Sequence, residues 1–256
     1  MIRIKEYVVA ESLEQAYLLN QKKNNRIIAG MLWLKMSRLN INTAIDLSDL
    51  GLDKIEETQE EFRIGCMTSL RDIEQHVGLN EYTQDAISDC LKDIVGVQFR
   101  NLATIGASIY SRFGFSDALC LLLCLDTYVE LYKGGIVPLC EYNEMKKDRD
   151  ILIRIIIKKQ KNFKCAFTCL RNSKTDFSVI NVALSRSLGT VSVCVGARPM
   201  RAKRLSFDLS QIQSKQELAE MVCNSLSFGS NMRATGRYRK HLAGILISRL
   251  WEEIIR

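Results

Sequence analysis

The hydrophobic pattern changes near residue 163, and this change most limits the folds open to the chain. Three runs after that point alternate apolar and polar residues as half-buried strands do: FKCAFTCLR (163–171), FSVINVALSR (177–186) and TVSVCVGARP (190–199). Polar turns join the runs, and helix patterns follow near residues 215–226 and 235–253. We therefore expect residues 161–256 to form an antiparallel sheet covered by helices.

Residues 1–52 have a different pattern, that of a small β-α-β unit. An alternating run at residues 2–9 predicts a strand, and Ser12 is placed as the N-cap of the helix that follows. Ile27 and Ile28 then indicate a short buried strand that ends at Gly30.

Residues 53–160 predict a second α/β unit. We expect a hairpin and a strand first, then a helix from about Asn80 to Ile94 and a buried helix over residues 115–125. A second hairpin, which turns at Gly134–Gly135, precedes a strand at residues 151–159. The predicted fold class is therefore α+β, with three domains at residues 1–52, 53–160 and 161–256.

The segment VQFRNLATIGASIYSRFGFSD, residues 97–117, has the composition of a ligand-binding loop. Its small residues Gly106, Ala107 and Ser108 would let the backbone approach a bulky ligand. Backbone N–H groups freed at such a turn can form a nest for an anion. Asp117, further along, could hold a sugar hydroxyl or an amine, although it could equally cap the helix that follows.

Cysteine and charge exclude some functions. The nine cysteines include no C-x-x-C pair, and only two histidines are present, so we predict no metal site. We interpret the cysteines as small buried residues kept reduced in the cytoplasm, and no apolar run is long enough to span a membrane. The net charge of +7 suits nucleic acid, an anionic cofactor or an acidic partner subunit.

Basic residues also gather near the end of the sequence. A nucleic-acid-binding module would present them as a face with a docking motif, and no such motif is present. The same helix has an apolar stripe that would dock it on its own sheet, so we predict no nucleic-acid partner. The basic residues are Arg233, Arg237, Arg239, Lys240, His241 and Arg249, and the stripe is Leu242, Ile245, Leu246, Leu250 and Ile254.

Residues 100–119 resemble the second FAD-binding loop of the molybdenum-hydroxylase flavoproteins, R-N-x-x-T-I-G-G-N-I followed by S-D-L. Here Ala107 and Ser108 replace the second glycine and the asparagine. The matching residues are Arg100, Asn101, Thr104, Ile105, Gly106, Ile109, Ser116, Asp117 and, one position late, Leu119. Four further segments are similar to family motifs and occur in the family's order: residues 26–36, 63–74, 195–205 and 232–250.

The resemblance implies a two-lobed FAD-binding domain of the vanillyl-alcohol-oxidase (PCMH) type, followed by an antiparallel sheet with helices. In the family, two loops hold the cofactor. The implied first loop here is Ile28, Ala29, Gly30, Met31, Leu32 and Trp33, and the implied second loop is Asn101, Thr104, Ile105, Gly106, Ala107 and Ser108, with Asp117 nearby.

Both loops leave alternatives open. In the first loop, Met31 takes the place either of a family glycine or of a family Thr or Ser, and Trp33 either covers the cofactor or packs in the core. In the second loop, Thr104 could simply cap a helix while Gly106 packs. We expect Gly106→Val to abolish flavin retention and leave the fold intact, and Trp33→Ala to alter flavin affinity.

The resemblance also implies the function. Electrons would arrive from an iron–sulfur subunit, which receives them from a molybdenum-cofactor subunit, and would pass through FAD to NAD+ or another acceptor. Such a flavoprotein needs no catalytic acid or base, and we predict none. The alternatives are an assembly subunit with a degenerate flavin site and a basic nucleic-acid-binding module.

Overall fold

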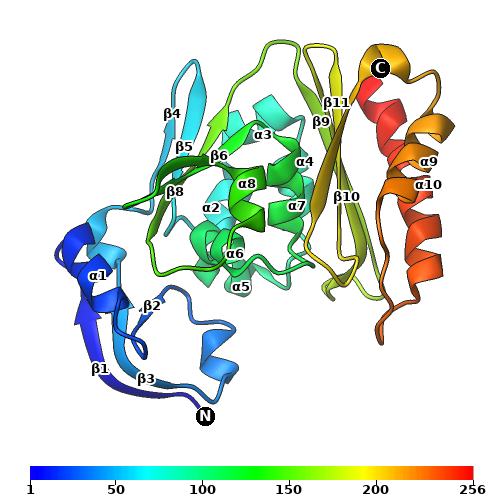
Figure 1. Ribbon diagram of the computed structural model, residues 1–256. Coiled ribbons are helices and arrows are strands. Elements are labelled where there is room, and N and C mark those ends of the chain that lie inside the picture. Colours follow the sequence, from blue (N-terminus) through cyan, green and yellow to red (C-terminus); the bar gives the residue numbers. More distant parts are fainter. Residues whose placement is uncertain (256) are drawn as a thin grey trace.

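The computed structural model describes residues 1–255, in which three sheets alternate with helices. Figure 1 shows the layers in order: a five-stranded sheet, a layer of helices, a four-stranded sheet and two long helices on the outside. A small three-stranded lobe projects on the side of the five-stranded sheet and carries the N-terminus (Figure 1). The combination of parallel and antiparallel sheets with helices confirms the predicted α+β class.

The N-terminal lobe has the predicted β-α-β order, followed by a third strand. Its parallel sheet has the order β1-β3-β2. The hydroxyl of Ser12 accepts a hydrogen bond from Gln15 N at 3.1 Å, so Ser12 caps the helix as predicted. The elements are β1 (Arg3–Val9), α1 (Leu13–Asn20), β2 (Arg26–Ile28) and β3 (Asn40–Asp46), with single 3₁₀ turns at Leu34–Met36 and Ser48–Leu50.

The central unit packs helices on one face of an antiparallel sheet with the order β4-β5-β8-β6-β7. The predicted hairpin at Gly134–Gly135 joins β6 to β7. The strands are β4 (Ile55–Glu57), β5 (Glu61–Gly65), β6 (Thr127–Leu131), β7 (Gly135–Pro138) and β8 (Leu152–Lys158). The helices are α2 (Leu70–Gln75), α3 (Val77–Thr83), α4 (Ala86–Leu91), α5 (Val97–Leu102), α6 (Ile105–Ser111), α7 (Asp117–Cys124) and α8 (Leu139–Glu144).

The C-terminal unit is the predicted antiparallel sheet covered by helices. Residues Ser178–Ser185 of β10 are all buried, because α7 packs on one face of this sheet and α10 on the other. The elements are β9 (Lys164–Arg171), β10 (Ser178–Ser187), β11 (Thr190–Gly196), β12 (Lys203–Asp208), a 3₁₀ turn at Leu209–Gln211, α9 (Lys215–Ser225) and α10 (Gly236–Ile255).

Three predictions about elements were wrong. The helix expected over residues 80–94 is broken into α3 and α4, because Gln84 and Asp85 both adopt left-handed backbone conformations. Strand β12 was not predicted, since half of its residues are exposed, none is buried, and its apolar alternation is short. Ile245, assigned to the buried stripe of α10, is instead 36% exposed.

One large hydrophobic core joins the three units. Its buried residues extend from Ala10 in the N-terminal lobe to Ala202 beyond β11. A second cluster fills the space between the four-stranded sheet and helices α9 and α10. Each sheet lies within one predicted domain range, but the shared core crosses both boundaries, so the division into three domains stays a prediction.

Candidate functional site

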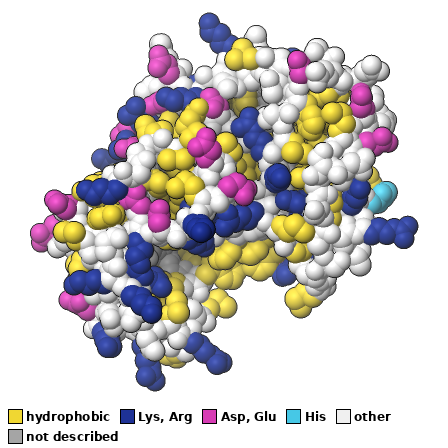
Figure 2. Space-filling model, viewed as in Figure 1, with side chains coloured by type: hydrophobic (Ala, Val, Ile, Leu, Met, Phe, Trp, Pro, Cys, Tyr) yellow, Lys and Arg dark blue, Asp and Glu magenta, His cyan; other side chains and the backbone are white. Residues whose placement is uncertain are grey.

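A cavity of about 930 Å³ lies where the three units meet. Residues 26–34 of the N-terminal lobe, residues 103–118 of the central unit and residues 171–177 of the C-terminal unit contribute to its wall. Figure 2 shows hydrophobic side chains along the recess between the N-terminal lobe and the rest of the molecule. Its size is within the range of pockets that enclose a large organic ligand.

The first loop, residues 29–33, supplies backbone donors to this cavity. In the part of the chain that the structure describes, the N–H groups of Gly30, Met31, Leu32 and Trp33 have no hydrogen-bond partner. Met31 has φ of 58°, a left-handed conformation that favours glycine. This conformation favours the alignment that puts Met31 in the place of the second family glycine and Leu32 in the place of the hydroxyl residue.

Gly30 serves a packing role beside these donors. A Cβ at this position would lie 1.9 Å from the carbonyl oxygen of Leu102, so any larger residue would push the first loop away from α5. The glycine thus brings the loop against the central unit, where its residues line the cavity.

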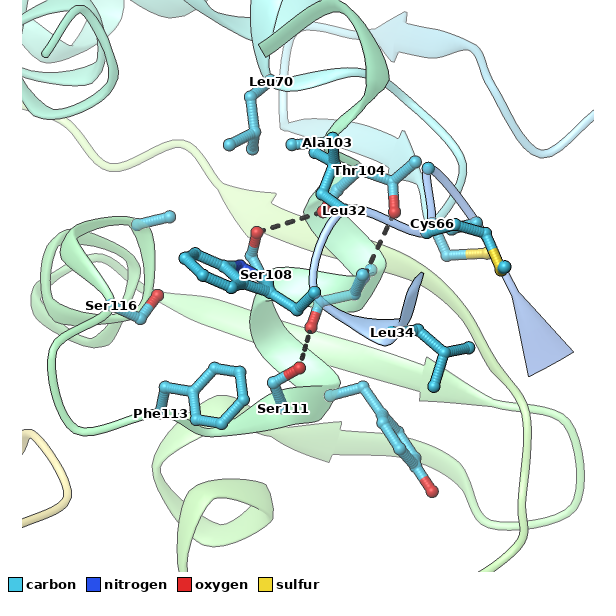
Figure 3. Close-up of a pocket in the computed structure, with 18 of the residues that line it drawn as sticks. Leu32, Leu34, Cys66, Leu70, Ala103, Thr104, Ser108, Ser111, Phe113 and Ser116 are labelled. Carbon is cyan, nitrogen blue, oxygen red and sulfur yellow. Dashed lines mark hydrogen bonds between the residues drawn. The ribbon is translucent and has the colours of Figure 1, made fainter. Parts of the chain in front are cut away.

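The second loop begins a helix and does not form an open nest. Thr104 is the N-cap of α6, and its hydroxyl accepts a hydrogen bond from Ala107 N at 3.3 Å (Figure 3). The N–H groups of Ile105 and Gly106 donate to the carbonyls of Thr68 at 3.0 Å and Cys66 at 2.9 Å. The expected anion nest is therefore wrong, because the protein already binds these donors.

Gly106 is required by the fold. A Cβ at this position would lie 2.5 Å from the carbonyl oxygen of Cys66, inside the core. A branched side chain would push α6 away from Cys66, which directly follows β5. The expectation that Gly106→Val leaves the fold intact is therefore wrong.

Hydroxyl groups remain on the cavity side of α6. Ser108 and Ser111 donate back to the carbonyls of Thr104 at 3.1 Å and Ala107 at 2.6 Å (Figure 3). Because a hydroxyl can rotate, each could donate to a ligand oxygen instead. Ala107 is exposed on the same wall, so this helix presents small side chains to the cavity.

Asp117 lines the cavity, but its carboxylate is already bound. Arg171 lies 2.5 Å from Oδ2, while Ser178 and Asn181 donate to Oδ1 at 2.7 and 2.6 Å. Ser116, rather than Asp117, caps α7, since its hydroxyl accepts from Leu119 N. The geometry therefore gives Asp117 a role in joining α7 to β9 and β10, and offers little for a sugar or an amine.

Two predicted residues lie away from the cavity. Asn101 is exposed on α5, and Ile105 is buried in the main core. Arg100, in the same motif, pairs with Glu74 at 2.7 Å and is buried, so it does not face a ligand. The predicted residues that the structure does bring together around the cavity are Ile28, Ala29, Gly30, Met31, Leu32, Trp33, Thr104, Gly106, Ala107, Ser108 and Asp117.

Aromatic and charged residues that the sequence analysis did not assign also line the cavity. They are Phe99, Tyr110, Phe113, Phe115 and Phe177, with the charged residues Arg26, Lys147, Asp148, Arg149, Asp150, Arg171 and Asp176. Phe113 and Phe115 lie within the quoted motif segment, so their spacing could have signalled a ring-binding wall. Phe177 lies far away in the sequence, and only the fold brings it here.

Burial changes the acidity of two of these side chains. Burial, with the neighbouring cations of Arg112 and Arg201, lowers the pKa of Lys147. Burial, with the nearby carboxylate of Asp148, raises the pKa of the Tyr110 phenol. The ammonium of Lys147 lies 6.0 Å from the Tyr110 ring, so a cation borders this end of the cavity.

The arrangement defines a class of protein that encloses a large, partly aromatic ligand between a small lobe and a larger body. The family described as "FAD binding domain in molybdopterin dehydrogenase" matches residues 2–159. The chain therefore belongs to this family of FAD-binding domains.

Relatives cover almost the whole chain. The protein YgfM of Escherichia coli K12 is 24% identical over 255 residues, which span 98% of this chain and 96% of YgfM. A reconstituted CO dehydrogenase of Oligotropha carboxidovorans has a similar fold, with a TM-score of 0.86 and 20% identity over 98% of both chains. Quinoline 2-oxidoreductase of Pseudomonas putida 86 has a TM-score of 0.84 and 17% identity over 97% of this chain and 96% of its own.

The residues present fit FAD on one wall of the cavity and only partly on the other. The first loop offers unbound N–H groups, which a pyrophosphate requires. The α6 wall offers rotatable hydroxyls in place of N–H groups.

Within residues 1–255, no group of His, Cys, Asp or Glu residues is placed to hold a metal ion, and no helix is both long and apolar enough to cross a membrane.

Proposed function

We propose that this chain binds FAD in the cavity between its lobes. It would pass electrons from an iron–sulfur partner subunit to NAD+ or another acceptor. It would act as the flavoprotein subunit of a xanthine dehydrogenase-like complex that also includes a molybdenum-cofactor subunit. Family membership supports the cofactor, and the folds of the CO dehydrogenase and quinoline 2-oxidoreductase chains support the type of complex. Nine free cysteines suit the reducing cytoplasm as its location.

The observation that carries this proposal is the set of unbound N–H groups at Gly30–Trp33 in a cavity of about 930 Å³. An N–H group without a partner is costly where water cannot reach it, and Gly30, Met31 and Leu32 are half-buried, so this loop favours a ligand that accepts hydrogen bonds. The two phosphates of FAD are acceptors of this kind.

The residues of the chain would position the cofactor and supply no acid or base. The first loop would hold the pyrophosphate from one side, and the hydroxyls of Ser108 and Ser111 would orient it from the other. Bound FAD would supply the redox chemistry. The protein's part is therefore to fix the cofactor near the surface, where partner and acceptor can reach it.

A second candidate is an assembly subunit that keeps the fold and binds no flavin. The bound N–H groups of Ile105 and Gly106 favour it, because the second loop lacks free backbone donors. So does Leu32, which replaces the family hydroxyl residue in the first loop.

Substitutions at Ala107 test where the pyrophosphate lies. Ala107 is exposed on the cavity wall, so Ala107→Glu, Ala107→Gln and Ala107→Lys should all fold. We expect Ala107→Glu to weaken FAD binding at least tenfold relative to the isosteric Ala107→Gln, because a carboxylate repels phosphate. Ala107→Lys should bind at least as tightly as Ala107→Gln. Equal affinity for all three would remove the pyrophosphate from this wall.

A flavin reconstitution experiment separates the two candidate functions. The purified chain is mixed with FAD and desalted, and retained flavin is measured per chain. About one flavin per chain supports the flavoprotein role, whereas a chain that remains colourless supports the assembly role. Anaerobic NADH should then bleach the flavin if this chain itself receives the nicotinamide, and an unreactive flavin would indicate another acceptor.

A further inference from the structure

Four aromatic side chains converge at one end of the cavity, and we call them the aromatic corner: Trp33, Phe99, Phe115 and Phe177. The Trp33 ring centroid lies 5.9 Å from that of Phe99 and 5.5 Å from that of Phe177. Phe115 and Phe177 lie 4.4 Å apart. All four line the cavity and come from all three units of the fold.

Phe177 is held in place by ion pairs on both sides. Arg171, paired with Asp117, donates to the carbonyl of Asp176 at 2.5 Å. Arg233 pairs with the Asp176 carboxylate at 3.2 Å and lies 4.9 Å from the Phe177 ring centroid. These contacts fix the β9–β10 turn that carries Phe177. Asp117 contributes indirectly, because it holds Arg171 against the turn.

Trp33 has far fewer restraints. Its side chain is 46% exposed, and in the described part of the chain its indole N–H has no hydrogen-bond partner. It belongs to the first loop, whose free N–H groups face the cavity. The Trp33 and Phe177 rings lie 31° from parallel with their centroids 5.5 Å apart, so Trp33 must swing away from Phe177 before a flat ring can stack between the two faces.

We propose that the aromatic corner takes the isoalloxazine ring of FAD, with Phe177 as the fixed wall and Trp33 as the movable wall. This inference rests on the proposed function and names the part of the cavity where the redox ring lies. Flat rings stack favourably on aromatic faces, and the corner is the main aromatic surface of the cavity wall.

Exposure favours the isoalloxazine ring over adenine. Trp33 and Phe115 are 46% and 36% exposed, and neighbouring Phe113 is 42% exposed. The corner therefore opens to the surface. A ring that exchanges electrons with other molecules needs such an opening, whereas adenine, which only binds, gains more from complete burial.

Binding measurements with whole FAD and its fragments test the proposal. The full-length chain, Phe177→Leu and the control Phe207→Leu are titrated with FAD, riboflavin and ADP. Phe207 is a half-buried phenylalanine beside the second core, away from the cavity. We expect Phe177→Leu to weaken FAD and riboflavin about tenfold and ADP less than twofold, and Phe207→Leu to change none of them.

Trp33 provides a second test that does not depend on Phe177. Trp33→Leu should weaken riboflavin and FAD about tenfold, and Trp33→Phe should restore most of that affinity. In a Trp251→Phe background, Trp33 is the only tryptophan, since the sequence contains two. Riboflavin should then quench its emission strongly, and ADP should not. Equal thermal unfolding midpoints of the variants would exclude misfolding as the cause.

The outcomes distinguish this inference from the proposed function. If the unaltered chain binds FAD but Phe177→Leu and Trp33→Leu bind riboflavin equally well, no flavin ring lies in the corner and only this inference fails. If ADP and FAD weaken in parallel, the corner takes adenine and the inference is again wrong. If the unaltered chain binds no FAD, the proposed function fails and this inference with it.

Discussion

Two glycines of the site matter because they lack a single atom, the Cβ. Gly30 and Gly106 let two backbone segments touch, and each lies against a carbonyl oxygen of the neighbouring segment. The sequence motif identified both residues, but it could not show whether their N–H groups point at a ligand or at another part of the protein. That distinction depends on Leu102 and Cys66, each of which lies in a different segment of the sequence from the glycine that it contacts.

Gly106→Ala should destabilise the protein by about 2–3 kcal/mol, because the new methyl group would press on the Cys66 backbone. Urea unfolding measures the effect. Gly244→Ala in α10 is the matched control, since its Cβ would meet only Cys223 Sγ at an ordinary 3.8 Å, and we expect a gain of about 0.5–1 kcal/mol. An unchanged free energy of unfolding in Gly106→Ala would contradict the packing role.

Glu61 makes a pH-dependent contribution between strands β5 and β8. Hydrogen bonds from Lys158 and then Arg63 lower the pKa of its carboxyl group. Because the folded-state pKa lies below the unfolded value of about 4.3, this stability is present above that pH and is lost as the pH falls through the folded pKa.

Glu61→Gln should therefore cost about 1 kcal/mol at pH 7, a modest value because Lys158 and Arg63 are 47% and 48% exposed. Near pH 3 the cost should shrink, since the protonated glutamate resembles glutamine. Unfolding free energies at both pH values provide the check, and a cost that does not vary with pH would show that the ion pairs contribute nothing.

At the scale of elements, helix α10 shows that a residue in a basic stretch of sequence can be buried and structural. Arg239 belongs to the basic residues gathered near the end of the sequence, yet its side chain is only 1% exposed. Its guanidinium donates to the carbonyls of Val179 and Ala197 and to the side chain of Asn231. Burial lowers its pKa, but the three acceptors hold the charge in place. The arginine therefore joins the start of α10 to the ends of β10 and β11.

Arg239→Met should cost about 3 kcal/mol, because it leaves the buried carbonyl groups of Val179 and Ala197 without the guanidinium that donates to them. Arg237→Met is the matched control on the same helix. Arg237 is exposed, so its loss should change the free energy of unfolding by less than about 0.5 kcal/mol. Similar values for the two variants would mean that the Arg239 hydrogen bonds add no net stability.

Elements with local signals were predictable from the sequence, and elements set by distant contacts were not. Ser12 caps its helix where the sequence places the cap, because a cap depends on a few adjacent residues. The break between α3 and α4 has no glycine or proline to announce it, since Gln84 and Asp85 carry the left-handed conformation. Tertiary packing overrides their local preference there.

At the scale of the whole molecule, the cavity exists only because three units meet. Its first loop and α6 wall were predicted from motifs, but Phe177 and Arg171 come from a sheet that no motif linked to the ligand. A sequence pattern reports residues close along the chain, whereas this wall depends on how the β9–β10 turn reaches the N-terminal lobe. The sequence therefore located the first loop and the α6 wall of the site, but not its aromatic end.

A ligand that touches all three units should stabilise them together. At a free FAD concentration of 100 times Kd, binding adds about 2.7 kcal/mol, which should raise the midpoint of thermal unfolding by roughly 5–10 °C in a chain of this size. ADP at the same multiple of its own Kd should give an equal shift, because linkage depends on occupancy and not on ligand size. The shapes of the transitions should differ if FAD contacts Phe177 in the C-terminal unit, as proposed, and ADP does not. FAD should therefore sharpen unfolding into one transition, and an N-terminal lobe that still melts separately with FAD bound would show that the cofactor does not bridge the units.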